Sequence, residues 1–270
     1  MSDSEGSKGA KPQMTDTVVR PLAGRGVLVT GASSGIGRAI AVAAARAGAD
    51  VALTYRSNES GAREVQGEIR TLGRRAAAIQ FDLMDERSVN ALGPAARDAL
   101  GRLDVWVNNA GADILTGSGA LLSDVEKLDL LLAADLRGTI LASWRAAEML
   151  GAQEEGGVII NMSWDHVLTG MAGLNPQLHA ATKGAVLAFS KSLARSVAPR
   201  VRVNVLAPGW IETSFGAGLD EGRRVAVAES TPLKRWGTPD DVAGAAVFLA
   251  SPAAAFLTGQ TILVGGGVVM

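Results

Sequence analysis

A glycine-rich segment near the start of the chain has the residue types and the spacing of a phosphate-binding turn. Residues 30–37 read T-G-A-S-S-G-I-G, after the apolar run V-L-V and before the helix-like run R-A-I-A-V-A. Gly31 permits a sharp turn, Gly35 lets the backbone approach a pyrophosphate, and Gly37 lets the helix pack closely on the strand. Free N–H groups and the positive end of the helix dipole then face the phosphates. A plain strand–helix connection looks the same locally, but the strand before the turn and the helix after it favour nucleotide binding.

The end of the second expected strand carries a cue to the kind of nucleotide. Residues 54–58 read T-Y-R-S-N. An NAD-binding site of this type usually places an acidic residue here to bond the ribose hydroxyls, and none is present. Arg56, with Ser57 beside it, can instead pair with a 2′-phosphate through its planar guanidinium. The alternative is a solvated surface arginine. We therefore expect NADP(H) as the cofactor, with NAD(H) less favoured.

Alternating apolar strands and helices must position these residues. The expected strands cover residues 27–29, 51–54, 76–81, 105–107, 158–160, 201–206 and 261–264. The expected helices run through 64 and 69 and over about 86–100, 125–150, 178–197 and 240–250. Strands this apolar are buried on both faces, as in a parallel sheet covered by helices. We expect an α/β fold, a single doubly wound Rossmann domain with a seven-stranded parallel sheet over 21–270, after a disordered tail over 1–20.

Composition limits the class of protein. With 270 residues, of which 47% are hydrophobic and 20% charged, the chain has the size and balance of one globular domain. The formal net charge of −1 argues against partners such as nucleic acid or a membrane surface. There is no cysteine, which fits a cytoplasmic protein, and His166 and His179 are the two histidines, so no metal site is expected. No apolar run is long enough to span a bilayer, and the N-terminus lacks the apolar core of a signal peptide.

Three further motifs follow along the chain. Residues 108–111 read N-N-A-G, residues 208–213 read P-G-W-I-E-T, and residues 231–243 contain T-P-L and then G-T-P-D-D-V-A. With T-G-x-x-x-G-x-G, these motifs make about residues 22–267 resemble the short-chain dehydrogenase/reductase family. In that family the aspartate after the third strand meets the adenine, and the threonine of the P-G segment contacts the nicotinamide amide. The resemblance implies that a nicotinamide cofactor is held by Gly31, Ser33, Ser34, Gly35, Ile36, Gly37, Asp82, Leu83, Asn109, Ala110, Gly111, Lys183, Pro208, Gly209, Ile211 and Thr213.

The resemblance also locates the expected chemistry, and there this chain departs from the family. The family usually works through Asn, Ser, Tyr and Lys. Its Tyr exchanges the proton, its Lys lowers the pKa of that Tyr and holds the nicotinamide ribose, and its Asn holds a water against the Lys. Here Lys183 is kept, but His179 stands four residues before it in place of Tyr, and Asp135 stands at the Asn position. The one tyrosine of the chain, Tyr55, belongs to the adenosine end of the fold.

The serine position is altered as well. The fifth strand leads into N-M-S-W-D-H, where Trp164 follows Ser163 at the position at which the family commonly has a second, catalytic Ser. The loop from Trp164 to His179 is longer than is usual in the family, so it carries an insertion. Whether Ser163 reaches the substrate is therefore open.

Two histidines are candidates for handling the proton. Imidazole donates and accepts a proton near neutral pH, but it is shorter than a phenol, and the charge of Lys183 favours its neutral form. Asp135 can offset that effect by pairing with Lys183. His166, beside Asp165 on the substrate loop, is the second candidate. The alternatives are a packed His179, a salt-bridged Asp135 and a loop His166 without a role.

The tryptophans indicate the character of the substrate. Trp164 and Trp210 map to the rim of the nicotinamide pocket, which suggests an apolar or aromatic substrate. Trp106 and Trp144 are expected in the core. One hypothesis is an NADP(H)-dependent oxidoreductase that acts on a small carbonyl or imine through a rewired active site. The other is a non-redox enzyme or a catalytically silent nucleotide-binding protein on the same fold.

Self-association is expected from the long helix at 125–150. Its segment 128–141 is apolar on more than one face, so it must bury a second side besides the one on the sheet. We expect a homodimer or homotetramer that uses this helix and the helix carrying Lys183.

Overall fold

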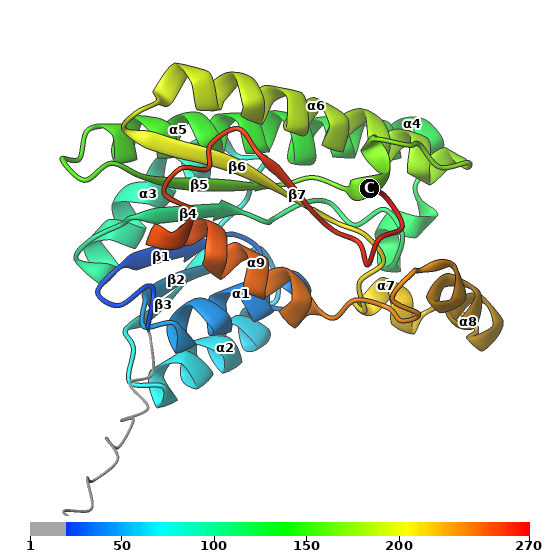
Figure 1. The fold of residues 1–270 in the computed structure, drawn as a ribbon, viewed down its shortest axis with the longest axis horizontal. Coiled ribbons are helices and arrows are strands. Elements are labelled where there is room, and N and C mark those ends of the chain that lie inside the picture. Colours follow the sequence, from blue (N-terminus) through cyan, green and yellow to red (C-terminus); the bar gives the residue numbers. More distant parts are fainter. Residues whose placement is uncertain (1–19) are drawn as a thin grey trace, which may run out of the picture.

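A parallel sheet with helices on both faces forms the molecule (Figure 1). The computed structural model describes residues 20–270, apart from the side chain of Phe215. The strands of this part are β1 (Gly26–Val29), β2 (Asp50–Tyr55), β3 (Ala76–Gln80), β4 (Val105–Asn108), β5 (Gly157–Met162), β6 (Val201–Pro208) and β7 (Thr261–Val264). Their order is β3-β2-β1-β4-β5-β6-β7, and every neighbouring pair is parallel. The predicted doubly wound α/β fold is confirmed, whereas the predicted tail over 1–20 lies outside the described residues, apart from Arg20.

Helices alternate with these strands along the described chain. They are α1 (Gly35–Arg46), α2 (Glu59–Thr71), α3 (Glu86–Leu100), α4 (Asp124–Leu131), α5 (Thr139–Gly151), α6 (Leu174–Val197), α7 (Ser214–Ala217), α8 (Glu221–Ser230) and α9 (Pro239–Ala250). The shorter turns are η1 (Gly117–Leu121), the π-helical η2 (Leu132–Gly138), η3 (Asp165–Val167) and η4 (Pro252–Ala254). None of the helices described here combines the length and the hydropathy that a bilayer crossing requires.

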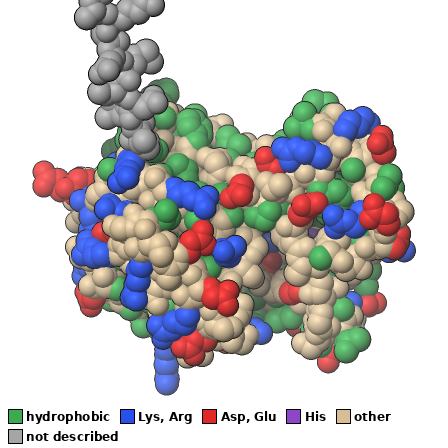
Figure 2. All heavy atoms as spheres, turned by 90° about the horizontal axis from the view of Figure 1, so that it is seen from below, with side chains coloured by type: hydrophobic (Ala, Val, Ile, Leu, Met, Phe, Trp, Pro, Cys, Tyr) green, Lys and Arg blue, Asp and Glu red, His purple; other side chains and the backbone are tan. Residues whose placement is uncertain are grey.

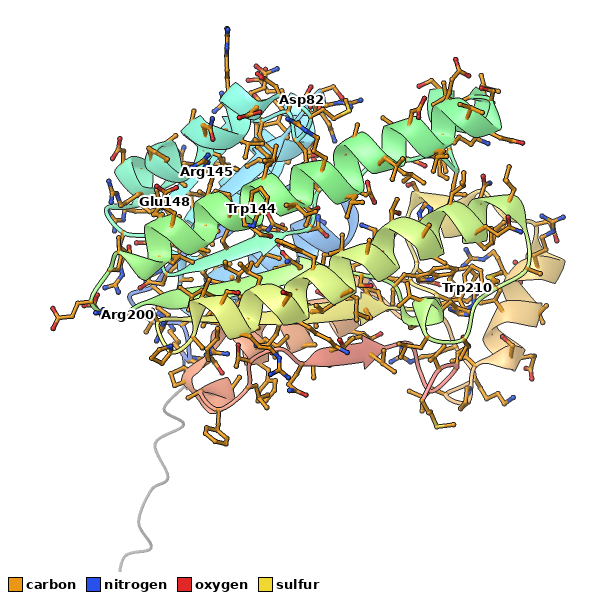
Figure 3. The ribbon with its side chains drawn as sticks, turned by 90° about the horizontal axis from the view of Figure 1, so that it is seen from above. Asp82, Trp144, Arg145, Glu148, Arg200 and Trp210 are labelled. Atoms are coloured by element: carbon orange, nitrogen blue, oxygen red, sulfur yellow. The ribbon has the colours of Figure 1, made fainter. Side chains whose placement is uncertain are left out.

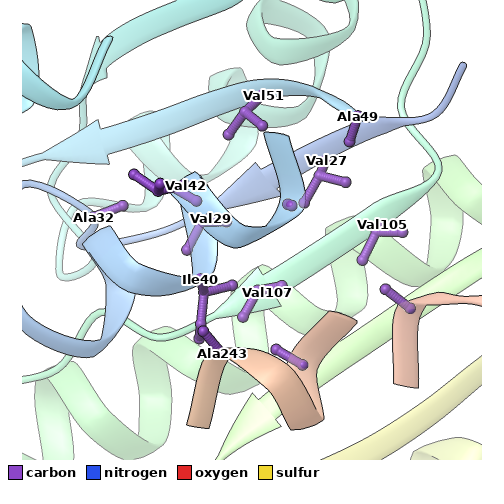
Figure 4. Packing of buried hydrophobic residues seen from close by; sticks show 14 of the residues in the cluster. Val27, Val29, Ala32, Ile40, Val42, Ala49, Val51, Val105, Val107 and Ala243 are labelled. Atoms are coloured by element: carbon purple, nitrogen blue, oxygen red, sulfur yellow. The ribbon is translucent and has the colours of Figure 1, made fainter. Parts of the chain in front are cut away.

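The strands are apolar throughout because helices cover both faces of the sheet. Val29 of β1 belongs to one buried cluster with Ile40 of α1 and Ala243 of α9 (Figure 4). Leu28 and Trp106 point the other way and belong to a second cluster with residues of α3, α5 and α6. Successive side chains of a strand alternate between its faces, so a strand covered on both sides reads as a continuous apolar run.

The long helix predicted over 125–150 forms, but it is widened in the middle. Ser123 begins α4 with a capping box, in which its side chain accepts from the Glu126 N–H and the Glu126 side chain accepts in return. The π-helical turns of η2 then join α4 to α5. Turns of this kind often occur at functional sites, and this one carries Asp135, which is 1% exposed.

Helix α6 begins at Leu174, four residues earlier than the predicted start at 178. Pro176 falls in its first turn, where the N–H that proline lacks has no partner within the helix. The earlier start places Asn175 on the helix, four residues before His179 and on the same face. Helices α7 and α8 were not predicted, and α8 begins at Asp220, whose side chain accepts from the Arg223 N–H at 2.9 Å.

The two tryptophans expected in the core have different environments. Trp106 is fully buried, as predicted, but the prediction for Trp144 is wrong because it is 53% exposed on α5 (Figure 3). Ala142 and Ala146, two residues to either side, are buried against the sheet. A helical period of 3.6 residues turns the residue between them toward solvent, where Trp144 meets Phe189 of α6 edge-to-face, with ring centroids 6.4 Å apart.

Candidate active site

The glycine turn between β1 and α1 is as closely packed as a phosphate cradle requires. Gly31 and Gly35 have positive φ angles of 64° and 56°, a region that favours glycine. A Cβ on Gly31 would lie 2.9 Å from the Cα of Ala110, and one on Gly37 would lie 2.3 Å from the carbonyl oxygen of Gly31. The Ser34 side chain makes no capping bond to α1, so it leaves the first-turn N–H groups to other acceptors.

The end of β4 braces this turn through hydrogen bonds. The Asn109 side-chain amide donates to the carbonyl oxygens of Thr30 and Gly31, at 2.9 and 3.0 Å. The backbone N–H groups of Asn109 and Ala110 both donate to the Thr30 hydroxyl, each at 3.0 Å. The N-N-A-G segment therefore holds the turn in place from the neighbouring strand.

A cavity of about 650 Å³ opens beside the turn at the carboxyl ends of the strands. In the space-filling view the surface is hollowed between the main body and the part where α7 and α8 lie, with acidic and basic side chains interspersed around it (Figure 2). Most of the predicted cofactor residues line the cavity, namely Gly31, Ser33, Ser34, Arg56, Ser57, Asp82, Leu83, Asn109, Ala110 and Gly111. Because an added Cβ at Gly31 would collide with the Ala110 main chain, the observed backbone of the turn fits the close approach of a nucleotide.

The adenosine side of this cavity is formed after β2 and β3. Arg56 is exposed on the wall, and its backbone oxygen accepts from the Gln80 side chain at 3.3 Å. Asp82 lies at the same side (Figure 3), and its carboxylate accepts from the Met84 N–H at 2.9 Å. No acidic side chain occurs at residues 54–58, so the wall beside Arg56 keeps the feature that the sequence led us to expect of an NADP(H) site.

A second cavity, of about 370 Å³, lies on the other side of the turn and has a different character. Four of the predicted cofactor residues, Ile36, Gly209, Ile211 and Thr213, form part of its wall together with Trp164 and Trp210. Trp210 lies at the end of the sheet near the first turns of α6 (Figure 3). The remaining lining residues are Leu115, Met171, Asn175, Pro176, His179 and Trp236. The wall is apolar and aromatic and contains no charged residue.

His179 lies on this wall next to a buried ion pair. The Lys183 Nζ is 2.8 Å from Asp135 Oδ2, and the side chains of Lys183 and Asp135 are 13% and 2% exposed. Asp135 Oδ1 also accepts from the Ala112 N–H at 2.7 Å, which ties the ion pair to the loop after β4. The pairing that the sequence suggested for Asp135 and Lys183 is present as a direct contact between the two side chains.

The protonation of His179 follows from its surroundings. Burial lowers the pKa of His179 below its usual value of 6.5, and the neighbouring Lys183 charge lowers it further. Asp135 and Asp113 act in the opposite direction with smaller effect. His179 Nδ1 is buried and has no hydrogen-bond partner among residues 20–270. The imidazole is therefore neutral at pH 7, with a polar atom unsatisfied.

Ser163 is not brought to either cavity. It is 6% exposed, and its hydroxyl donates to the backbone oxygen of Lys183 at 2.8 Å. That bond joins the end of β5 to α6. Trp164, the next residue, turns toward the second cavity instead.

His166 and Asp165 pack behind the aromatic wall. The Nδ1 of His166 is 2.6 Å from Asp165 Oδ1, and the imidazole stacks on Trp164 with ring centroids 4.9 Å apart. Trp210 meets the other side of His166 edge-to-face, at 6.0 Å. Asp165 is fully buried, and burial raises the pKa of its carboxyl. Neither residue lines a cavity, so this pair supports Trp164 and Trp210 and does not face the hollow.

Other predicted residues lie close to the cavities without lining them. Gly35, Gly37 and Pro208 belong to the supporting backbone, and Lys183 lies behind His179. Sequence reasoning missed Asn175 and Trp236. The spacing of Asn175, four residues before His179, was an available signal once the helix was extended. Trp236 had none, because it meets Trp210, at 5.6 Å between ring centroids, only through the folding of the loop after α8.

Comparison with known proteins agrees with this geometry. A family model described as enoyl-(acyl carrier protein) reductase matches residues 31–269. An uncharacterized oxidoreductase of Methylorubrum extorquens is 40% identical over 92% of this chain and 98% of its own length. The 3beta-hydroxysteroid dehydrogenase 1 of Eggerthella lenta is 36% identical over 92% of this chain and 95% of its own.

A solved structure shows the same likeness in three dimensions. A short-chain dehydrogenase from Burkholderia cenocepacia, in complex with NADP, superimposes with a TM-score of 0.82 and 35% identity, covering 92% of this chain and 99% of that one. Matches of this extent cover the sheet, the glycine turn and both cavities. The chain therefore belongs to the short-chain dehydrogenase/reductase family of NAD(P)-dependent oxidoreductases.

Proposed function

We propose that the protein is an NADP(H)-dependent oxidoreductase of a small, apolar or aromatic carbonyl or imine compound, with His179 in the position of the family's tyrosine. The observation that carries this proposal is the uncharged, tryptophan-lined cavity with His179 on its wall and the Lys183–Asp135 ion pair behind it. Apolar walls with few polar groups are typical of sites for small organic ligands.

The cofactor would span the glycine turn. Residues of the turn, Gly31, Ser33, Ser34, Gly35, Ile36 and Gly37, would hold the pyrophosphate, and Asp82 and Leu83 the adenine. Asn109, Ala110, Gly111, Lys183, Pro208, Gly209, Ile211 and Thr213 would hold the nicotinamide half. When bound, the nicotinamide supplies or accepts a hydride.

The choice of NADP(H) rests on the residues after β2. Arg56 and Ser57 line the first cavity, and the segment lacks a carboxylate that would repel a 2′-phosphate. A guanidinium binds phosphate through two parallel N–H groups, which adds to the affinity for the phosphorylated cofactor. The NADP complex of a similar protein supports this choice.

The neutral state of His179 determines what it does best. A neutral imidazole has a free lone pair that can accept a proton at pH 7, although its lowered pKa makes it a weaker base than a free histidine, whereas its remaining N–H is a very weak acid. His179 therefore suits the oxidation of an alcohol, in which it takes the hydroxyl proton. Reduction of a protonated imine suits it equally well, because no proton has to be donated to the substrate. Reduction of a plain ketone is the reverse of that oxidation and takes its proton from protonated His179, a form that is scarce at pH 7, so it should gain rate as the pH falls.

Lys183 and Asp135 would act together beside the reacting groups. Lys183 would hold the nicotinamide ribose, and its charge keeps His179 in the proton-accepting form. Asp135 neutralises part of that charge and fixes the ammonium through a 2.8 Å contact. The Ser163 hydroxyl is bonded to the α6 backbone, so it does not take part in our proposal.

Oxidation of NADPH in the presence of defined substrates tests the proposal. We would compare 1-tetralone with 3,4-dihydroisoquinoline, and assay the matching alcohol with NADP⁺, using wild type, His179→Ala and His179→Tyr. We expect the imine to react fastest, and the ketone and its matching alcohol, which interconvert through the same proton transfer, to react slowly in their two directions at pH 7. His179→Tyr should raise ketone reduction by up to about 10²-fold, because a phenol can donate the proton.

Two outcomes would contradict it. Fast ketone reduction that His179→Ala leaves unchanged would show that the proton comes from another group. No turnover in any of these assays, with NADPH still bound, would favour the alternative of a nucleotide-binding protein without redox activity on such compounds.

We also propose that the chain forms a homodimer or homotetramer through α4, α5 and α6. Trp144 and Leu132 are 53% and 40% exposed on this side, and Phe189 of α6 touches Trp144. Helices α5 and α6 lie side by side over one face of the sheet (Figure 3). Light scattering at micromolar concentration should give a dimer or a tetramer, and Trp144→Glu should weaken it. A monomeric wild type would overturn this proposal.

A further inference from the structure

Two polar side chains stand on the same face of α6 inside the second cavity. Asn175 and His179 are four residues apart, so one lies a helical turn above the other. Apart from these two and Thr213, the side chains that line this cavity are apolar or aromatic. The pair therefore concentrates the hydrogen-bonding capacity of the α6 side of the wall.

Each of the two carries a buried atom without a partner. Asn175 Oδ1 and His179 Nδ1 have no exposed surface of note and no hydrogen-bond partner within residues 20–270. Buried polar atoms in proteins are almost always satisfied, and leaving one unpaired is costly. Both side chains line one cavity, a helical turn apart, so a change of side-chain rotamer would let these unpaired atoms meet a ligand bound there.

We propose that Asn175 is a specificity-determining residue that binds a second polar group of the substrate. This inference rests on the proposed function, which puts the reacting group of the substrate at His179. The second polar group then lies about 6 Å from the reacting group, because four helical residues rise by that distance. An unpaired amide oxygen accepts, so this group is a hydroxyl or an N–H donor.

The cavity also restricts the rest of the substrate. No lining residue is charged, so a charged group entering it would lose its hydration without a counter-ion. Trp164, Trp210 and Trp236 offer flat apolar surfaces. The substrate class is therefore a neutral, flat, mostly apolar molecule with the reacting carbon at one end and a hydroxyl or N–H donor at the other.

A matched pair of ketones tests the role of Asn175. 6-Hydroxy-1-tetralone carries a hydroxyl across the ring from its carbonyl, and 1-tetralone lacks it. Their dissociation constants from the enzyme saturated with NADP⁺ can be measured by quenching of tryptophan fluorescence. In wild type we expect the hydroxylated ketone to bind about tenfold more tightly, as for one well-made hydrogen bond.

Variants assign that preference to one side chain. Asn175→Ala should bring the two dissociation constants within about twofold while leaving that of 1-tetralone unchanged, and alanine suits a helix. Gln177→Ala changes an exposed amide in the same helical turn and should keep the tenfold ratio. A variant that only disturbs folding would weaken the binding of both ketones together. The ratio of the two dissociation constants therefore separates recognition of the hydroxyl from a general structural change.

The outcomes also distinguish this inference from the proposed function. A wild type that binds both ketones equally, or neither, overturns the inference, as does an Asn175→Ala variant that keeps the preference. If the preference follows Asn175 but neither the ketones nor their alcohols react with NADPH or NADP⁺, the proposed reaction fails and the recognition by Asn175 stands.

Discussion

The two cavities that flank the glycine turn are built from different parts of the chain. The larger one includes glycines, Gly31 and Gly119, whose added Cβ atoms would collide with neighbouring main chain. The smaller one is formed by side chains, three of them tryptophans. In the first, the residues match the family's motifs. In the second, the resemblance to the family predicts His179 in place of its tyrosine and Trp164 in place of its catalytic serine.

This difference shows where a fold of this kind tolerates change. A backbone cradle cannot be altered one residue at a time, because any side chain at Gly31 or Gly37 displaces the turn. A wall of side chains can be exchanged while the strands and helices stay in place. Ser163 illustrates this, since its hydroxyl still joins β5 to α6 although it no longer faces the hollow.

Removing Lys183, which forms the buried ion pair with Asp135 behind His179, should have the largest effect. Lys183→Ala should lower kcat/KM by about 10²–10⁴-fold in either direction, because it removes the proposed anchor of the nicotinamide ribose and the charge beside His179. Lys191→Ala, on the same helix but exposed, is the matched control and should leave kcat/KM unchanged. Steady-state rates with NADP⁺ and NADPH give the measurement.

A second variant separates the chemical role of Lys183 from its structural one. Lys183→Ala leaves the Asp135 carboxylate buried without its partner, which costs about 3 kcal/mol of unfolding free energy. Adding Asp135→Asn should restore most of the stability in urea unfolding but none of the activity. Recovery of turnover in the double variant would mean that Lys183 acts only through stability.

The next largest effect is expected from a substitution in the glycine turn at residues 30–37. In Gly37→Ala the new Cβ meets the Gly31 oxygen at 2.3 Å and the Asn109 amide at 2.5 Å, so the turn must shift. We expect a loss of about 2–3 kcal/mol in unfolding free energy and weaker NADPH binding. Gly67→Ala is the control: it lies in α2 with nothing within 4 Å of its added Cβ. Alanine there should stabilise the protein by roughly 0.5–1 kcal/mol.

Arg56 tests how much one side chain of the larger cavity contributes to the affinity for NADPH. Arg56→Ala should weaken NADPH binding by roughly 10–100-fold, as for a lost charged hydrogen bond, and leave NADH nearly unchanged. Arg63→Ala, an exposed arginine paired with Glu59 on α2, should change neither. Titration of both cofactors by fluorescence decides the matter, and an equal loss for NADPH and NADH would remove the 2′-phosphate role.

The smallest effect is expected in the pH dependence of kcat/KM, which reports on His179 in the smaller, tryptophan-lined cavity. Because the pKa of His179 is lowered below 6.5 by burial and by Lys183, its proton-accepting form persists to lower pH. The acid limb of kcat/KM for alcohol oxidation should therefore lie below pH 6.5. Asp135→Asn removes a carboxylate that raises this pKa, so the limb should move lower still. An acid limb above pH 6.5 would assign the titration to another group.

Sequence reasoning succeeded unevenly, and the reasons are physical. The strands, the glycine turn and the alternation were predictable because each depends on neighbouring residues, through burial on both faces or through φ angles that only glycine adopts readily. The pairing of Asp135 with Lys183 was predictable because the two residues stand at the positions of the family's Asn and Lys. The start of α6 was predicted four residues late, although Pro176 is a residue that a first helical turn tolerates.

The fold class, the glycine turn and the presence of a single tyrosine, Tyr55, could be read from the amino-acid pattern, since each depends on residue types and their local order. The folded chain was needed to show that Ser163 turns to the α6 backbone, that His166 and Asp165 pack behind the tryptophans, and that Trp236 joins Trp210. These contacts join side chains from segments far apart in the chain. Their directions depend on how helices and loops pack over the end of the sheet, and no local pattern encodes that packing.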